Sequence, residues 1–509
     1  MGENSKNVAK VASITIGSRV LGLVRDIVSF ALLGAGAVNS AFLFAYALPN
    51  LLRRMMGEGA LASAMVPVFS NTLRDNGKER AFAFLNRVLT RAGAVLIIGV
   101  LLLSIFALGY EHFLANEERH ILGARFSAIL MPYGFFICVA ALMAAVLNVL
   151  GIFALPAMGA IWLNVSMIVS LIVGGYLAQT QIGIVYWGCA GILIGGIIQY
   201  GLPLYCLRKS GWRFRLDFSP TPELTALFKL FLPALFGAAV IQFNILISKF
   251  LGMYLNDYAV SIIYLSSRLL ELPLGIFTIA IATVYFPKLS LLNNDSDSTG
   301  YVREYKSALN AINCISIPAA FGLCIFSYDI LSFLFEWGAF KAEDVSIAAP
   351  VLMISALALP AISISTIIVR GFYSRCNTKT PVYISLAVFF VNLILSLILI
   401  ALDFGVIGLA LANTVASVFH TITLWTYFKK YIGKMSLFSE TFKILGATIF
   451  MCLVAYSSRM IFVNFFDEKY LSLVVCLISI PLGALTYFAF LKLFKFEQLK
   501  DFKLSKILR

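Results

Sequence analysis

The sequence predicts an all-α polytopic membrane protein with fourteen transmembrane helices, in which two six-helix lobes surround a central cavity and two helices are appended at the C-terminal end. Of the 509 residues, 61% are hydrophobic and only 13% are charged, far from the composition of a usual soluble domain. Apolar runs of membrane-spanning length recur along the chain. A helix of that length satisfies its own backbone hydrogen bonds in hydrocarbon, so lipid can cover its apolar surface.

The apolar runs and their polar breaks give the predicted spans in chain order. They are 8–34, 39–70, 88–110, 121–150, 155–178, 183–207, 224–255, 258–287, 307–335, 345–373, 381–402, 404–428, 443–464 and 470–491.

The connections between spans alternate in charge. With the N-terminus inside, the inner segments carry 26 Lys and Arg residues, whereas the outer loops carry only Arg119, Lys341 and Lys469. Outer segments such as YEHFLANEE are acidic. By the positive-inside rule we expect both termini in the cytoplasm. The net charge of +14 is therefore distributed along the membrane surface, not gathered on one soluble face as nucleic-acid binding would require.

The chain also repeats itself weakly at an offset of about 220 residues. DIVSFALLG (26–34) resembles NILISKFLG (244–252), and VPVFS (66–70) resembles FPKLS (286–290). Two halves with six spans each are parallel repeats, and a binding site is expected between them near the midplane. The predicted domains are an N-terminal lobe over 1–215, a C-terminal lobe over 216–430, and the last two spans with a basic tail over 431–509.

Charged residues cluster in three of the predicted spans, although one ionised group at a helix centre costs about 2.5–3.5 kcal/mol on insertion scales. The first span contains SRVLGLVRD (18–26), whose polar side chains fall within a wedge of about 120° around Gly22. The second contains PNLLRRMMGEGA (49–60) and the eighth SSRLLELPLG (266–275). The candidate substrate-binding residues are Arg19, Arg25, Asp26, Arg53, Arg54, Glu58, Arg268 and Glu271.

Two interpretations of these charges are open. Pairs such as Arg25 with Asp26, or Arg54 with Glu58 one helical turn later, could be structural ion pairs. As a set, however, the five arginines outnumber the three acids, and a cationic cavity favours an anion. Arg25 and Arg268 are each predicted about 14 Å from the outer surface. Because guanidinium binds phosphate bidentately, the set favours a diphosphate.

Three other intramembrane charges lie nearer the span ends, whereas Lys249 and Arg370 lie deeper and are candidates for lining the second half of the cavity. Arg125, Lys229 and Arg459 are interpreted as side chains that reach the membrane surface. The eight cysteines are scattered in apolar runs without metal-ligand spacing, and we interpret them as core residues.

At the charged motifs the sequence resembles the MurJ/MviN family, the lipid II flippases of the multidrug/oligosaccharidyl-lipid/polysaccharide exporter superfamily. The resemblance extends to GFYSRCNTKTP (371–381) and to the number of spans. It implies a V-shaped pair of lobes in the bacterial cytoplasmic (inner) membrane. These lobes would move lipid II, the undecaprenyl-diphosphate-linked peptidoglycan precursor, from the inner to the outer leaflet by alternating access. Family residues of known importance correspond to the candidate arginines and acids above.

The resemblance also implies that spans 13 and 14 form a groove for the polyprenyl tail. One position departs from the family. Where several relatives have Asp after the first outer loop, this chain has Asn39, which puts a salt bridge at that point in doubt.

Three rival functions remain. A related exporter of drugs or of another polyprenyl-linked glycan is the nearest, although a cation-drug exporter should have an acidic cavity. A membrane-embedded glycosyltransferase would need catalytic groups in outer loops, which are short here, and a scaffold would leave the arginines unexplained. No nucleotide-binding motif is present, so we expect no direct use of ATP. We also expect no enzyme activity, no metal and no cofactor. The expected partners are lipid II, the bilayer and cell-wall synthesis enzymes, and no nucleic acid.

Overall fold

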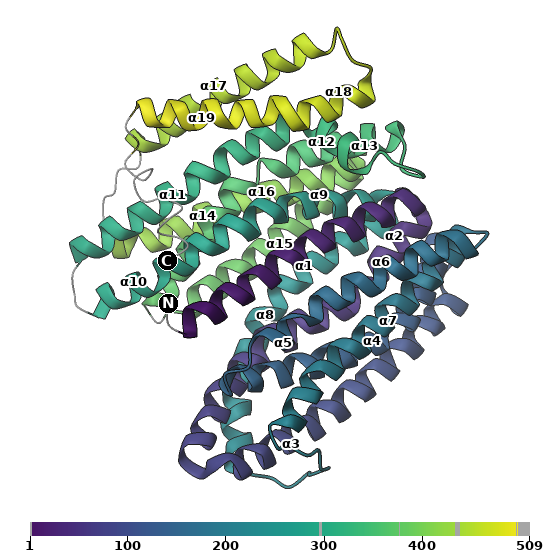
Figure 1. The fold of residues 1–509 in the computed structure, drawn as a ribbon, viewed down its shortest axis with the longest axis vertical. Coiled ribbons are helices and arrows are strands. Elements are labelled where there is room, and N and C mark those ends of the chain that lie inside the picture. The colour runs from purple at the N-terminus through teal and green to yellow at the C-terminus, as the bar shows by residue number, and fades with distance from the viewer. Residues whose placement is uncertain (1–2, 295–297, 376, 433–437, 495, 497–509) are drawn as a thin grey trace. The chain divides into compact units, whose positions relative to one another are not determined.

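The computed structural model describes residues 3–294, 298–375, 377–432, 438–494 and 496, and all the regular elements within these ranges are helices (Figure 1). The first elements are α1 (Glu3–Leu33), α2 (Ala37–Leu52), the π-helical segment η1 (Arg53–Ala60), α3 (Leu61–Phe113), α4 (Glu118–Val149), α5 (Ala154–Ala157), α6 (Gly159–Leu177), α7 (Gln181–Lys209) and α8 (Pro222–Leu255). They are followed by α9 (Ala259–Pro273), the π-helical segment η2 (Leu274–Thr278), α10 (Ile279–Asn294), α11 (Ser298–Ile325), α12 (Ser327–Phe335), α13 (Ala342–Ala356), α14 (Leu359–Ser374), α15 (Lys379–Ala401) and α16 (Gly405–Ile432). The last are α17 (Phe438–Phe462), α18 (Glu468–Val474), the π-helical segment η3 (Val475–Ser479) and α19 (Ile480–Leu493).

The helices pack as two units. The first contains residues Met1–Ser261 together with the short segment Trp337–Phe340, and the second contains Ile262–Glu336 and Lys341–Arg509. In the first unit α4 is central, because it packs against α2, α3 and α7 and is the most buried of the long apolar helices. Its Phe126, Leu130 and Tyr133 lie in a continuous apolar core.

The second unit is built around α11, which contacts α10, α13, α14 and α17. The antiparallel helices α17 and α19 lie side by side, in yellow in Figure 1, and pack along α11 through a separate apolar cluster. We call α17, α18, η3 and α19 the appended hairpin.

The prediction of an all-helical membrane protein is confirmed for the described residues, of which eleven helices are long and apolar enough to cross a bilayer. The predicted spans that fall short of this criterion are the three with charged motifs, 8–34, 39–70 and 258–287, although all three are helical. Charged residues lower the mean hydropathy of the first of these spans, and π-helical segments divide the other two into shorter helices such as α2, with 16 residues, and α9, with 15. The count of fourteen transmembrane helices stays a prediction.

The first helix of the second sequence repeat, α8, belongs to the first unit. It packs against α2, η1 and α3, and Glu223 at its start forms an ion pair with Arg80 at 3.0 Å. Just beyond its end, Asp257 pairs with Arg119 at 2.8 Å. The predicted lobes have boundaries at 215 and 430. Packing in one state does not test those boundaries, so they stay a prediction.

Candidate functional site

The charged wedge of α1 faces protein. Arg25 and Asp26 are 7% and 2% exposed, whereas Ile16, Val20 and Val24 on another face are 60%, 57% and 40% exposed. This apolar stripe recurs every four residues, as expected for the lipid-facing side of a helix. The helix therefore turns its apolar side outward and its charged residues toward its neighbours.

Arg25 is held by three helices. Its Nε and Nη2 donate to Oδ1 of Asp26 at 3.0 and 2.6 Å, and its Nη1 donates to Oδ1 of Asn164 in α6 at 3.2 Å. The guanidinium carbon lies 5.6 Å from the ring centroid of Tyr46 in α2. Asn164 in turn donates to the Ser18 carbonyl at 3.1 Å, which fixes α6 against α1. The ion pair between Arg25 and Asp26, one of the two interpretations left open by the sequence, is present.

The second charged motif lies on a broken helix. Arg53 and Arg54 begin η1, where the backbone changes from α-helical to π-helical geometry after Pro49. The Arg53 side chain is half-buried and its Nε donates to Oδ1 of Asn50 at 3.3 Å, while Arg54 is exposed. The side chain of Glu58 lies outside the described residues, so the predicted pair with Arg54 is not described.

The end of α1 is tied to the start of α2 and to the segment Trp337–Phe340. The buried Asn39 donates through Nδ2 to the Gly34 carbonyl at 2.6 Å, a bond that an ionised aspartate could not donate. Gly34 and Gly338 have positive φ angles of 64° and 61°. A Cβ on Gly34 would lie 3.0 Å from the Ala339 carbonyl oxygen, and one on Gly338 would clash with the Ala31 carbonyl oxygen.

The same region contains a contact between equivalent positions of the two repeats. Ser40 and Ser261, which are 221 residues apart, are both fully buried, and their hydroxyl oxygens are 2.9 Å apart. The spacing matches the repeat offset predicted from the sequence. The starts of α2 and α9 therefore touch through corresponding residues.

In the second unit, Arg268 and Glu271 of α9 form an ion pair at 3.1 Å, with side chains 19% and 49% exposed. Regular α-helical spacing would place Thr278, seven residues after Glu271, on the same face of the helix. Thr278 is instead 5% exposed, and its hydroxyl lies 3.1 Å from that of Ser363 in α14. The reason is η2, because π-helical geometry after Pro273 changes the angular spacing on which the prediction relies.

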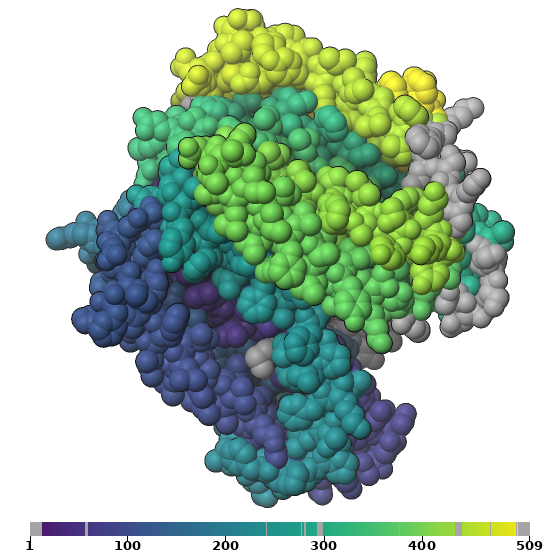
Figure 2. Space-filling view, turned by 180° about the vertical axis from the view of Figure 1, so that it is seen from behind, coloured from purple at the N-terminus to yellow at the C-terminus, as the bar shows by residue number. Residues whose placement is uncertain are grey.

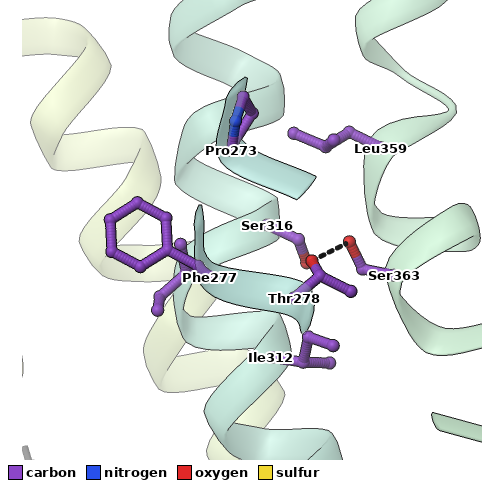
Figure 3. A pocket seen from close by; sticks show the side chains of 8 residues that line it. Pro273, Phe277, Thr278, Ile312, Ser316, Leu359 and Ser363 are labelled. Atoms are coloured by element: carbon purple, nitrogen blue, oxygen red, sulfur yellow. Dashed lines mark hydrogen bonds between the residues drawn. The ribbon is translucent and has the colours of Figure 1, made fainter. Parts of the chain in front are cut away.

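Figure 3 shows the surroundings of this break. Pro273, Phe277 and Thr278 face Ile312 and Ser316 of α11 and Leu359 and Ser363 of α14, and the dashed line joins Thr278 to Ser363. The space between them is too narrow for a water molecule, so side chains of α11 and α14 pack closely against this part of η2.

Most of the chain matches one known protein family. Residues 30–477 match the model of the family described as "Lipid II flippase MurJ". The chain belongs to the MurJ family of lipid II flippases. Its function is lipid II translocation, which is transport and not catalysis, and it acts in peptidoglycan synthesis. The predicted membership of this family is therefore confirmed.

Curated relatives agree along nearly the whole chain. A "Probable lipid II flippase MurJ" of Vibrio cholerae is 34% identical over 429 residues, which cover 82% of this chain and 81% of the relative. The protein of the same description from Bdellovibrio bacteriovorus is 31% identical and covers 99% of this chain and 98% of its own length.

Solved structures show the same fold. A lipid II flippase MurJ in an "inward closed conformation" superposes with a TM-score of 0.80 at 27% identity, covering 95% of this chain and 98% of that one. An inward-facing multidrug transporter of the MATE family has a TM-score of 0.68 at 13% identity, over 82% of this chain and 94% of that one, which shows a shared fold alone. Membership of the MurJ family therefore favours the lipid II function over the drug-exporter alternative.

The structure brings only part of the predicted set together. In the first unit, Arg25 and Asp26 are in direct contact, and Tyr46 links them to the turn with Asn50 and Arg53, because Asn50 donates to the Tyr46 carbonyl at 3.3 Å. Arg19 is half-buried and lies six residues before Arg25 in α1. Sequence reasoning missed Asn164, although a lone Asn within the apolar run IWLNVSM was a usable signal.

Two arginines interpreted as reaching the membrane surface have acidic partners. Arg125 pairs with Glu111 at 2.5 Å, with side chains 42% and 16% exposed. Arg459 pairs at 2.9 Å with Asp329, whose side chain is only 3% exposed. Glu111 lies across the turn between α3 and α4 from Arg125, and Asp329 is 130 residues from Arg459 in sequence. No local sequence pattern identifies either partner.

Proposed function

We propose that the protein moves lipid II from the inner to the outer leaflet of the bacterial cytoplasmic membrane by alternating access. Arg19, Arg25, Arg53, Arg54 and Arg268, with Asp26, Glu58 and Glu271, are its proposed substrate-binding residues. In this proposal the chain has fourteen spans and both termini in the cytoplasm. The appended hairpin receives the polyprenyl tail, and cell-wall synthesis enzymes are expected partners.

One observation carries the proposal. Arg53 and Arg54 stand at the start of η1, whereas Arg268 and Glu271 lie six and three residues before η2. The segment η2 begins 221 residues after η1, at position 274 against 53. Both repeats thus place an arginine motif at a break in the corresponding helix. Broken helices are where transporters build midplane sites, because the backbone can change there without breaking the whole span.

The net charge of the proposed site explains its substrate class. Five guanidiniums and three carboxylates leave a net positive charge, which a diphosphate neutralises, and arginine donates to phosphate in pairs. The paired state of Arg25 is consistent with a role in which Asp26 and Asn164 hold its guanidinium in place. The membrane potential supplies about 2.3 kcal/mol per charge per 100 mV, and an inside-negative potential favours outward movement of an anion.

The outer closure in this proposal consists of contacts within the first unit. The Ser40–Ser261 hydroxyl contact and the docking of Trp337–Phe340 on the end of α1 join segments from both sequence repeats. These contacts must break for the outer side to open. Lipid II must therefore bind the opened state more tightly than the closed state. A ligand with equal affinity for both states does not shift the equilibrium between them.

The experiment is substitution of Arg268 by Ala in cells that depend on this protein, with lipid II exposed on the outer face as the readout and protein level as a check. The matched control is Arg125→Ala, which removes the same group from an ion pair near the outer end of α3. We expect exposure to fall at least about tenfold in the first variant, as for loss of one charged contact. Normal exposure at normal protein level would contradict the proposed site.

A further inference from the structure

The appended hairpin lies outside both six-span repeats and is tied to the second unit near both ends. Figure 2 shows it in yellow along the surface of that unit. Toward one end, the Tyr487 hydroxyl donates to the Cys314 carbonyl of α11 at 2.6 Å, and both residues are buried. Toward the other, α18 and η3 pack against α12.

The contact at α12 is an ion pair. Nε of Arg459 donates to Oδ2 of Asp329 at 2.9 Å, and Asp329 is 2% exposed. The Cys476 thiol of η3 lies 3.7 Å from the Asp329 carbonyl oxygen. Within the described residues, the second oxygen of this carboxylate, Oδ1, is buried without a hydrogen-bond donor. Arg459 is thus the described countercharge of a carboxylate that is almost completely removed from solvent.

The ion pair matters because the other contacts of the hairpin are mostly apolar. Ile444, Ala447 and Met451 pack in one cluster with Cys314, and Ala455 packs with Phe326 in another. In a bilayer such contacts give little preference for one register, since lipid tails are as apolar as the side chains that they replace. A buried ion pair is directional, and separating it leaves an uncompensated charge.

We propose that Asp329 and Arg459 form a latch that fixes the outer end of the appended hairpin to α12, so that the hairpin and the rest of the second unit move as one body. They are positioning residues, whose effect on lipid II reaches the substrate through the hairpin. The transport part of this inference rests on the proposed function, whereas the structural part does not.

The structural part is tested by hydrogen exchange of the full-length protein. Arg459→Gln should speed amide exchange in residues 455–479 at least about tenfold, because the Asp329 charge loses its partner. Arg459→Lys keeps the cation and should stay within about threefold of the wild type. Lys443→Gln breaks the Glu440–Lys443 pair at the other end of the same helix and should leave residues 455–479 unchanged.

Coupling between the two residues is tested by adding Asp329→Asn. Once the carboxylate is neutral, loss of Arg459 should have little further effect, so the double variant should exchange no faster than Arg459→Gln alone. Exchange that is unchanged in Arg459→Gln, or strictly additive effects in the double variant, would overturn the latch.

The transport part needs a second readout. In Arg459→Gln, lipid II exposure should fall about tenfold while lipid II still binds the purified protein with wild-type affinity. Faster amide exchange together with a normal amount of lipid II on the outer face would overturn the role of the latch in transport. The latch itself would still stand. Failure of the proposed substrate site would appear separately, in Arg268→Ala.

Discussion

Arg25 shows how a charge is kept inside an apolar helix bundle. Its donors are divided between the carboxylate of Asp26 and the amide of Asn164, and its flat face lies near the ring of Tyr46. Lysine could not reproduce this arrangement, because its ammonium group lacks the planar fork. The guanidinium is therefore already oriented before any anion binds, which lowers the entropy that binding must overcome.

Asn39 gives the first prediction. Asn39→Asp replaces a donor by a buried charge and leaves the Gly34 carbonyl without this bond, so we expect the free energy of unfolding to fall by about 1–3 kcal/mol. The melting temperature in detergent measures this change. Asn71→Asp makes the same substitution on an exposed position of α3 and serves as the control. An equal melting temperature for Asn39→Asp and the wild type would contradict the prediction.

Asp217 gives a prediction for pH. It lies in the connector between α7 and α8, where the hydroxyl and amide of Ser219, and then Arg87, hold the pKa of its carboxyl below the ordinary value. Arg87 donates to its Oδ2 at 2.8 Å, and Arg91 donates to the Ser219 carbonyl at 3.0 Å. The connector is thereby docked on α3.

Because the folded-state pKa of Asp217 is lowered, its contribution to docking is complete above the ordinary Asp pKa of about 4 and is lost as pH falls through the folded value. Hydrogen exchange of residues 211–221 should therefore not change between pH 8 and 5, after correction for intrinsic rates, and should rise below about pH 4. Asp217→Asn should raise trypsin cleavage after Arg213 and Arg215 at neutral pH. Cleavage at the wild-type rate would count against this docking.

At the scale of elements, the breaks in the charged helices matter most. The segments η1 and η2 occupy corresponding places in the two repeats, and each follows a helix that ends near a proline, Pro49 or Pro273. A π-helical turn inside an α-helix is rare and is frequently found at functional sites. The two breaks are therefore the places where these helices can change direction at least cost.

Hydrogen exchange tests this element-scale inference. Amides of residues 53–60 and 274–278 should exchange at least about tenfold faster than those of residues 130–146 in the buried helix α4. Added lipid II should slow exchange in both segments, since each carries or adjoins proposed binding residues. Protection equal to that of α4 in both segments would show that they are rigid.

The positions of the helices can be predicted well from the sequence, whereas the residues that pair with the charged side chains cannot. Spans such as 121–150 and 381–402 are recognisable because each must be apolar over its whole length, and the structure has α4 and α15 at these places. Asn164, the second partner of Arg25, and Asp329, the partner of Arg459, lie 139 and 130 residues away, and no local pattern encodes such distances. The π-helical segments were missed because proline and glycine indicate a break without indicating its geometry.

At the scale of the whole molecule, the sequence repeat and the packing units do not coincide. By sequence, α8 opens the second half, yet it is tied to the first unit by Arg80 near its start and Arg119 near its end. The segment Trp337–Phe340 also belongs to the first unit. Segments of the second repeat that pack with the first unit are where we expect contacts to change during transport.

The central claim is that arginines at equivalent helix breaks bind the diphosphate of lipid II. It is tested most directly by equilibrium binding of lipid II to the purified full-length protein and to its Arg53→Ala, Arg268→Ala and Arg125→Ala variants. We predict that the first two substitutions weaken binding about tenfold or more, and that Arg125→Ala, the matched control, binds as the wild type does. Wild-type affinity in both Arg53→Ala and Arg268→Ala would contradict the claim.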